Sequence, residues 1–237
     1  MERVPRERGM VWKAVDWRRI TDVCVALGML VFLSPLFLVL LTINWLWTGR
    51  PFFRQTRLGR DLHPFMVLKF QTMRTGAEKG SSVTVSGDSR ITSYGRLLRA
   101  LKLDEVPQLL NVMRGEMTLV GPRPLTPNEV NAMPAHLASV VYRVRPGLTG
   151  VGALAFADEE SMLRQFAEPT LAYFQDILPR KVALELAYVQ RRTWWTDFLI
   201  ALMTPVAPFS ASVRQRLVLR LVPDWEGVAH AHDSGKS

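Results

Sequence analysis

Cysteine and histidine are scarce in this sequence, and their scarcity excludes several kinds of site. The 237 residues include 1 cysteine and 4 histidines. A single cysteine cannot form an internal disulfide, which excludes a disulfide framework and favours a reducing compartment. Cys24 lies in an apolar run, where a reactive thiolate is not expected. The histidines lack the spacing of a zinc site; they are His63, His136, His230 and His232.

Acidic residues are few relative to basic ones, at 21 against 30, so the formal net charge is +9. This balance favours an anionic partner, whether nucleic acid, anionic lipid or a phosphorylated substrate. The sequence has no Gly-x-x-x-x-Gly-Lys-Ser/Thr loop and no Gly-x-Gly-x-x-Gly after a strand, so it lacks the common nucleotide-binding fingerprints. Charge alone therefore leaves the kind of anion open.

Charged side chains are absent from one long segment, Val23 to Gly49. About 27 residues of straight helix would be ~40 Å long, more than the ~30 Å of a bilayer core, which predicts a membrane segment. A cleaved signal peptide is disfavoured because the run starts late, is too long and lacks a small-residue cleavage site. Ser34 and Pro35 fall near its middle, where proline bends a helix.

Basic residues flank this segment on both sides, which a simple membrane crossing does not explain. The positive-inside rule places basic flanks on the cytoplasmic side, and only a re-entrant hairpin that bends at Pro35 keeps both flanks there. A kinked spanning helix stays open, because proline is tolerated in membranes. The flanks contain Lys13, Arg18 and Arg19 before the segment, and Arg50, Arg54, Arg57 and Arg60 after it.

From Pro51 onward the composition is that of a soluble domain with short elements. Alternating β-branched and aromatic residues predict strands, glycine and serine predict loops, and capping residues mark helices. The expected elements are strands within 52–60 and 63–74, a loop over 75–90, a helix over 94–103 capped by Ser93, a helix over 106–115 with Pro107 in its first turn and Gly115 at its end, and helical stretches over 158–189.

Two later segments have the pattern of membrane-surface helices. Residues 193–203 combine Trp194 and Trp195 with an apolar face, as interfacial segments do. Residues 212–222 form a basic amphipathic stretch, so Arg214, Arg216 and Arg220 are expected to meet anionic headgroups.

Asp104 and Glu105 stand side by side just ahead of a predicted helix. They have two readings. Acids at a helix start are common and favourable, so the pair has an ordinary structural explanation. The alternative is a site for a phosphorylated substrate, in which carboxylates, nearby cations and a divalent metal act together. The spacing alone leaves both readings open.

Longer motifs narrow the choice. The stretches KFQTMR, GDSRITSYGRLLRALKLDEVPQLLNVMRGEMTLVGPRP and RPGLTG follow an apolar segment with Ser-Pro, in that order. Together they resemble the bacterial sugar transferase family, the monotopic phosphoglycosyl transferases (polyprenyl-phosphate sugar-phosphate transferases) that begin glycan assembly. The resemblance covers about Arg18 to Met203.

The resemblance implies a reaction and a set of site residues. A sugar phosphate would pass from a nucleotide diphosphate sugar, usually a uridine one, to polyprenol phosphate, through a covalent phospho-aspartate, releasing a nucleoside monophosphate. Asp104 and Glu105 match the family's catalytic pair, with Asp104 as nucleophile and Mg²⁺ ligand. The family's phosphate-binding cations match Lys69, Arg99 and Arg123, and its membrane helix break matches Ser34 and Pro35.

The sequence departs from the family pattern in three places. Gln71 stands where the family usually has arginine, Val151-Gly152-Ala153 replaces Trp-Ala-Gln, and Ala157 replaces an arginine thought to hold phosphate. These departures leave the sugar and the phosphate contacts in that corner open. They also keep an alternative of another class, a catalytically impaired membrane-anchored scaffold of the same fold.

The sequence as a whole predicts an α/β, mainly helical, small catalytic domain over 51–205. A basic segment and a re-entrant membrane helix would occupy 1–50, and a basic amphipathic stretch with a disordered tail 206–237. The additional spans of larger family members are not expected. The predicted location is the cytoplasmic face of a bacterial inner membrane. Predicted partners are a nucleotide diphosphate sugar, polyprenol phosphate and anionic lipid; nucleic acid is not expected, and a homodimer stays open.

Overall fold

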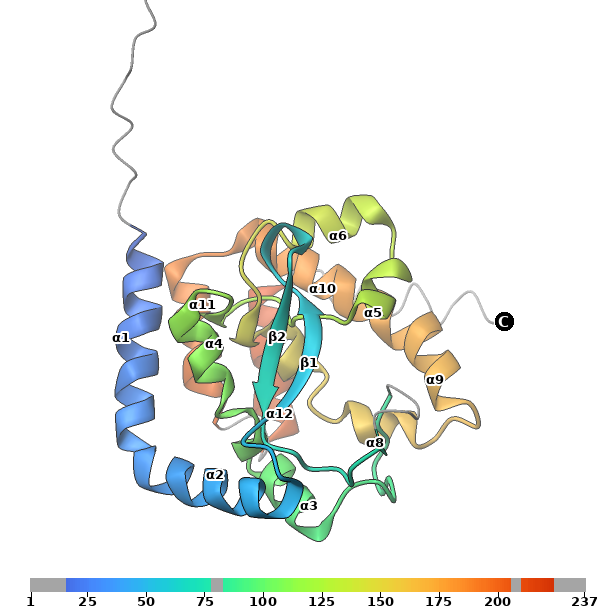
Figure 1. Ribbon diagram of the computed structural model, residues 1–237. Coiled ribbons are helices and arrows are strands. Elements are labelled where there is room, and N and C mark those ends of the chain that lie inside the picture. The colour runs from blue at the N-terminus through green and yellow to red at the C-terminus, as the bar shows by residue number, and fades with distance from the viewer. Residues whose placement is uncertain (1–15, 78–82, 206–209, 224–237) are drawn as a thin grey trace, which may run out of the picture.

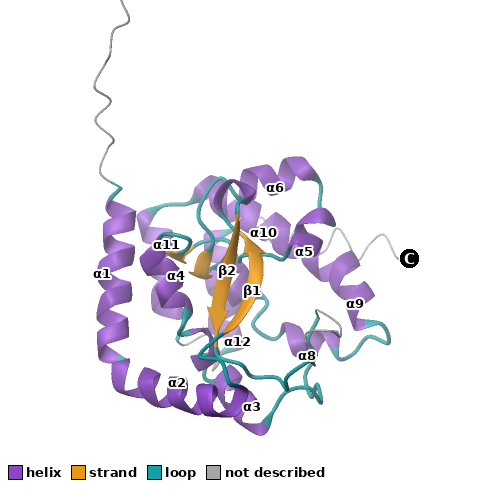
Figure 2. Cartoon of the chain, viewed as in Figure 1, coloured by secondary structure: helices purple, strands orange, loops and turns teal. Residues whose placement is uncertain are grey.

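Helices dominate the chain and surround two small sheets (Figure 1, Figure 2). The computed structural model describes residues 16–77, 83–205 and 210–223. The expected basic segment before residue 16 and the tail after residue 223 lie outside these ranges. The elements are α1 Trp17–Phe32, α2 Ser34–Thr48, β1 Phe53–Leu58, η1 Arg60–Leu62, β2 Pro64–Lys69, α3 Ser93–Ala100, η3 Leu103–Glu105, α4 Gln108–Arg114, β3 Thr118–Val120, α5 Pro127–Asn131, α6 Ala135–Val141, β4 Gly147–Thr149, α7 Val151–Ala155, α8 Glu159–Leu163, α9 Pro169–Ala172, η4 Tyr173–Ile177, α10 Leu178–Arg191, α11 Trp194–Met203 and α12 Ala211–Leu221.

The β1–β2 hairpin confirms the two predicted strands and presents one face to a cleft. The strands pair antiparallel, from Phe53 opposite Lys69 to Leu58 opposite Pro64. Side chains alternate between faces along a strand, so Val67 and Lys69 share a face with Gln55 and Arg57 on the partner strand.

The second sheet pairs β3 and β4 in parallel, with Thr118 opposite Gly147 and Val120 opposite Thr149. The loops that follow these strands cross closely. A Cβ atom on Gly150, directly after β4, would lie 2.2 Å from the carbonyl oxygen of Gly121, directly after β3, so only glycine permits this approach. The crossing brings the residues after β3 next to those after β4.

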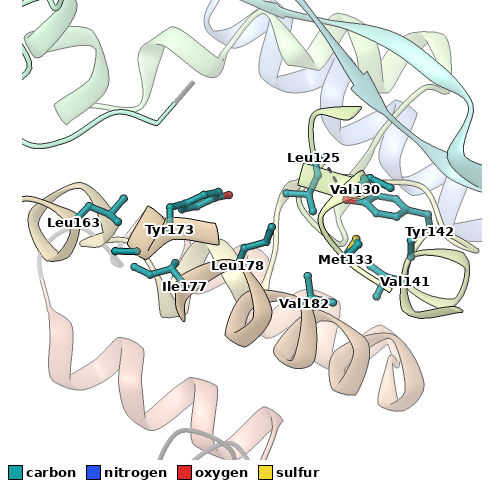
Figure 3. Packing of buried hydrophobic residues seen from close by; sticks show 12 residues of the cluster. Leu125, Val130, Met133, Val141, Tyr142, Leu163, Tyr173, Ile177, Leu178 and Val182 are labelled. Atoms are coloured by element: carbon teal, nitrogen blue, oxygen red, sulfur yellow. Dashed lines mark hydrogen bonds between the residues drawn. The ribbon is translucent and has the colours of Figure 1, made fainter. Parts of the chain in front are cut away.

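The largest part of the core lies between α6, η4 and α10 (Figure 3). Tyr142, at the end of α6, is 1% exposed, and its hydroxyl group accepts from the backbone nitrogen of Leu125 at 3.2 Å. The same hydroxyl group donates to the carbonyl oxygen of Arg123 at 2.9 Å. The core thus fixes the backbone of the loop that carries Arg123.

Helices α1 and α2 meet at Leu33 at an angle of 72° (Figure 1). Within the described ranges, no helix on its own is long and apolar enough to span a bilayer, and only this bent pair reaches that length together. Exposed apolar side chains are spread along both helices, from Trp17 at 67% through Phe32 at 84% to Leu46 at 80%. The break falls where Ser34 and Pro35 predicted it.

Both outer ends of this helix pair are attached to the rest of the chain. In α1, the carboxylate of Asp22 accepts from the Thr118 hydroxyl group at 2.6 Å and from the Leu119 backbone nitrogen at 3.1 Å. In α2, the Asn44 side chain donates to the carbonyl oxygen of Pro51 at 2.9 Å and accepts from the Gln71 backbone nitrogen at 3.0 Å.

Two helix expectations need correction. The cap of α3 is Thr92, whose hydroxyl group accepts from the Gly95 backbone nitrogen at 2.9 Å, so Ser93 is already helical. The helical stretches expected over 158–189 are interrupted between Leu163 and Pro169 and contain a π-helical turn, η4. Proline at 169 cannot continue a preceding helix, and therefore it starts a new one. The end of α4 at Gly115 is as expected, with φ of 83°.

The expectation that Arg214 meets lipid headgroups is wrong. Arg214 is 7% exposed and forms an ion pair with Asp158, next to α8. In α12 the residues Arg214, Val218 and Val222 recur every four positions, so one helical stripe turns inward and packs on the core. Arg216 and Arg220 remain exposed.

Candidate active site

The two adjacent carboxylates lie on the short turn η3, between α3 and α4. Lys102, just before the turn, has φ of 56°, which is uncommon for a residue other than glycine. The carbonyl oxygen of Asp104 accepts from the backbone nitrogen of Phe70 at 3.0 Å, which ties the turn to the end of β2. This contact sets Asp104 and Glu105 beside Lys69, the last residue of the strand.

A cleft of about 360 Å³, counting the open space at its mouth, runs beside this turn. Its floor includes the hairpin face with Val67, and one wall is the backbone of the β4 strand and Gly150. The polar side chains that line it are Arg57, Lys69, Glu105, Gln108, Arg123 and Thr149.

Glu105 is held between two cations. The Lys69 ammonium nitrogen lies 3.0 Å from its Oε1, and an Arg123 guanidinium nitrogen lies 4.0 Å from the same oxygen. Burial by itself would raise the pKa of Glu105, but the charges of Lys69 and Arg123 outweigh it and lower the pKa to about 2. Glu105 is therefore ionised at neutral pH.

Asp104 has a different environment, although it is the neighbouring residue. Its side chain is 7% exposed, and burial raises its pKa, against the opposing charge of Lys69. Within the part of the chain that the structure describes, the Asp104 carboxylate has no hydrogen-bond or ion-pair partner. A buried carboxylate without partners is costly, so this group is available to an incoming cation or an electrophile.

Two of the three predicted phosphate-binding cations line the cleft, and one does not. Lys69 and Arg123 face it, whereas Arg99 is not among its lining residues. The Arg99 guanidinium donates to the Thr72 hydroxyl group at 3.2 Å and forms an ion pair with Glu160 at 2.8 Å. Arg99 still lies near enough to Asp104 for its charge to lower the pKa of that carboxyl.

Arg57 and Gln108 line the cleft but were not predicted from the sequence as site residues. Arg57 donates to the carbonyl oxygen of Pro124 and to Glu129, both at 3.1 Å, which holds it against the loop after β3. Its position two residues after Gln55 in a predicted strand is the signal that could have placed it on the cleft face. Gln108 lies three residues after Glu105, in the first turn of α4, which turns it towards the same cleft.

Asp104 could supply one carboxylate ligand to a magnesium ion, although it does not belong to a larger group of metal ligands among the described residues. Among the described residues, no group of three or more His, Cys, Asp and Glu side chains could hold a metal. Magnesium needs no such cage, because it is commonly held by one or two carboxylates together with water and substrate phosphate oxygens. The unpartnered carboxylate of Asp104 suits that role, while Glu105 is occupied by Lys69.

Comparisons with known proteins identify the family of the chain. Residues 12–211 match the family model described as Bacterial sugar transferase. The UDP-glucose:undecaprenyl-phosphate glucose-1-phosphate transferase of Caulobacter vibrioides is 38% identical over 197 residues, covering 81% of this chain and 69% of that protein. The exopolysaccharide production protein ExoY of Rhizobium meliloti is 32% identical over 223 residues, covering 85% and 89%.

A third relative differs in its sugar. The UDP-N-acetylgalactosamine-undecaprenyl-phosphate N-acetylgalactosaminephosphotransferase of Aeromonas hydrophila is 30% identical over 193 residues, covering 79% of this chain and 42% of that protein. Similar chains thus carry names with different sugars but the same lipid acceptor.

Proposed function

The chain belongs to the bacterial sugar transferase family, and we propose that it transfers a sugar phosphate from a nucleotide diphosphate sugar to polyprenol phosphate. The expected nucleotide is a uridine one, as in the names of its relatives. The products are a polyprenyl diphosphate sugar and a nucleoside monophosphate. The chain is accordingly an enzyme of the undecaprenyl-phosphate sugar-phosphate transferase class, like its named relatives.

The proposed chemistry has two displacements at one phosphorus atom. An Asp104 carboxylate oxygen attacks the phosphate next to the sugar, and the bond to the bridging oxygen breaks, so the nucleoside monophosphate leaves with that bonding pair. A phosphate oxygen of polyprenol phosphate then attacks the same phosphorus and releases the Asp104 carboxylate. The covalent intermediate divides one difficult transfer into two easier ones.

The cations of the cleft would stabilise the charge on the transferring group. Lys69 and Arg123 lie on either side of Glu105, and both line the cleft. Fixed cations in such a position favour the transition state, where charge develops on phosphate oxygens. A magnesium ion at Asp104 would neutralise the diphosphate. Arg99 could reach phosphate only after it leaves Glu160.

We further propose that α1 and α2 form a re-entrant membrane hairpin. The contacts of Asp22 with β3 and of Asn44 with the segment after α2 support this, because both ends then lie on the side of the catalytic domain. The exposed side chains of Trp194, Trp195 and Phe198 on α11 support an interfacial role for that helix. The proposed location is the cytoplasmic face of a bacterial inner membrane.

The observation that carries the proposal is the buried carboxylate of Asp104, which has no partner among the described residues and lies beside the Lys69–Glu105–Arg123 cluster. The test is release of nucleoside monophosphate from a panel of nucleotide sugars by purified protein, with and without polyprenol phosphate. Lipid-dependent turnover with at least one nucleotide sugar is expected. If the correctly folded protein turns over none of them, the alternative of a scaffold with the same fold replaces the enzyme.

A further inference from the structure

Glu185 is a buried carboxylate in the middle of α10. Its side chain is 6% exposed. The Oε1 atom accepts from the backbone nitrogen of Arg123 at 3.3 Å, and the carboxylate also accepts from the backbone nitrogen of Gly152. One side chain from α10 therefore contacts both loops that form the wall of the cleft.

The present position of the Glu185 carboxylate depends on the absence of a side chain at Gly152. A Cβ atom there would lie 2.5 Å from Oε1 of Glu185, closer than such atoms can approach. The lack of a side chain at Gly152 leaves space for the Glu185 carboxylate.

The backbone of Arg123 is fixed on both sides, while its charged end is not. Glu185 accepts from its nitrogen and Tyr142 donates to its carbonyl oxygen. Its guanidinium group makes no hydrogen bond with any residue that the structure describes, and its ionic contact with Glu105 is 4.0 Å long. Because its backbone is fixed and its guanidinium group is available to hydrogen-bond, Arg123 is suited to bind an anionic ligand.

We propose that Glu185 is a positioning residue, whose carboxylate fixes the Arg123 and Gly152 backbone and so directs the Arg123 guanidinium into the cleft. This inference rests on the proposed function, because Arg123 is useful there only if a phosphate group enters. Glu185 itself does not touch the substrate. Its effect on the reaction passes through Arg123.

The charge of Glu185 matters less than its acceptor atoms. Its other oxygen, Oε2, is buried without a hydrogen-bond partner. Burial raises the pKa of Glu185 to about 7, against the charges of Lys181 and Arg123 and the hydrogen bonds from the two loops. Tyr142 and Tyr188 are the other titratable groups near it. An uncharged amide that keeps an acceptor oxygen should therefore replace it well.

The test compares steady-state kinetics of Glu185→Ala, Glu185→Gln, Arg123→Ala and the double variant Glu185→Ala/Arg123→Ala in the full chain. Glu185→Ala should lower kcat/KM about 10- to 100-fold, the usual consequence of losing an acceptor for buried donors. Glu185→Gln should remain within about 3-fold of the parent. The double variant should be no slower than Arg123→Ala, because residues that act as a unit are not additive.

A second variant guards against misfolding of Glu185→Ala. Gly152→Ala displaces the carboxylate without deleting it, and its effect should also vanish when Arg123 is alanine. Asp197→Ala is the matched control. Asp197 does not line the cleft, and its carboxylate accepts hydrogen bonds from Tyr188 and Arg192. It should lower thermal stability but leave kcat/KM of folded protein unchanged.

Multiplicative losses in the double variant, or a Gln variant as slow as the Ala variant, would overturn the positioning role. Either result can be interpreted only if the parent protein is active with at least one nucleotide sugar. An inactive parent with every nucleotide sugar contradicts the proposed function instead, so the two failures are distinguishable.

Discussion

At the scale of single residues, Asp104 and Glu105 show how neighbours in sequence acquire different chemistry. Lys69 and Arg123 keep Glu105 ionised, while burial raises the pKa of Asp104, whose carboxylate has no partner within the described ranges. Pairs of carboxylates whose environments push their pKa values apart commonly have separate roles in catalysis. This separation favours Asp104 as the nucleophile and Glu105 as the residue that holds the cations in place.

The first prediction concerns Asp104→Asn. Asparagine keeps the shape of aspartate but is not a nucleophile, so turnover should be lost while folding remains intact. Mass spectrometry of the parent, incubated with nucleotide sugar and Mg²⁺ without lipid acceptor, should show a sugar-phosphate adduct that the variant lacks. Near-parental turnover by the variant would contradict the role of Asp104 as nucleophile.

The second prediction concerns Lys69→Met and pH. The pKa of Glu105 falls from 4.5 to about 2 on folding, so Glu105 stabilises the fold above about pH 4.5, and this contribution disappears as the pH falls towards 2. The difference corresponds to about 3 kcal/mol at most. Lys69→Met should therefore lower the free energy of unfolding on the order of 1–3 kcal/mol at pH 7, and by less at pH 3.

Urea unfolding in detergent at the two pH values measures this difference. Lys102→Met is the matched control, because Lys102 is exposed and acts on Glu105 through its charge without a hydrogen bond. It should lose much less stability. Equal losses in the two variants would contradict the assignment of Lys69 as the main partner.

At the scale of elements, the break between α1 and α2 decides how the apolar segment meets a membrane. The hydroxyl group of Ser34 donates to the carbonyl oxygen of Val31 at 2.8 Å, and Pro35 has no backbone N–H to continue the preceding helix. Each helix alone has too few residues to cross, with 16 in α1 and 15 in α2. Removing the break would allow the two to join into one span.

The third prediction follows from that geometry. In a Cys24→Ala background, cysteines at the exposed positions Trp17 and Arg54 should both be labelled from the cytoplasmic side. Pro35→Ala should straighten the helix and shift some molecules to a form labelled from opposite sides. Ser34→Ala, which keeps the proline, serves as the control and should give the same labelling pattern as the parent. Opposite-side labelling in the parent would rule out the hairpin.

At the scale of the whole molecule, three consecutive acids connect distant elements. Asp158 pairs with Arg214 of α12, Glu159 with Lys181 of α10, and Glu160 with Arg99 of α3. These contacts make α12 part of the catalytic domain's packing, together with the core residues that it contributes. Truncating the chain before α12 would therefore disturb the core as well as any membrane contact.

The fourth prediction separates these two roles of α12. The double variant Arg216→Gln/Arg220→Gln removes two exposed charges, each worth about 1 kcal/mol near an anionic surface, so binding to anionic vesicles should weaken roughly 30-fold. Thermal stability should stay unchanged. Arg214→Met should lower thermal stability and leave vesicle binding unchanged, because it breaks the ion pair between a buried arginine and the half-exposed Asp158. Unchanged vesicle binding by the double variant would exclude these arginines from the membrane surface.

The sequence by itself determined the features that depend on neighbouring residues. The uncharged run, the break at Pro35, the two strands of the hairpin and the end of α4 at Gly115 all follow from local backbone preferences, and the long motifs identified the family. Local patterns suffice there because backbone conformation and hydrophobic periodicity are set within a few residues.

Only the tertiary structure decided which side chains share an environment. Arg99 turned to Glu160, 61 positions away, and Glu185 reached Arg123 across 62 positions. Arg214 turned inward although its helix looked like a membrane-surface helix, because its stripe packs on the core. Burial and charges on distant segments shift the pKa values of Asp104, Glu105 and Glu185, and no local pattern in the chain encodes which partners will meet.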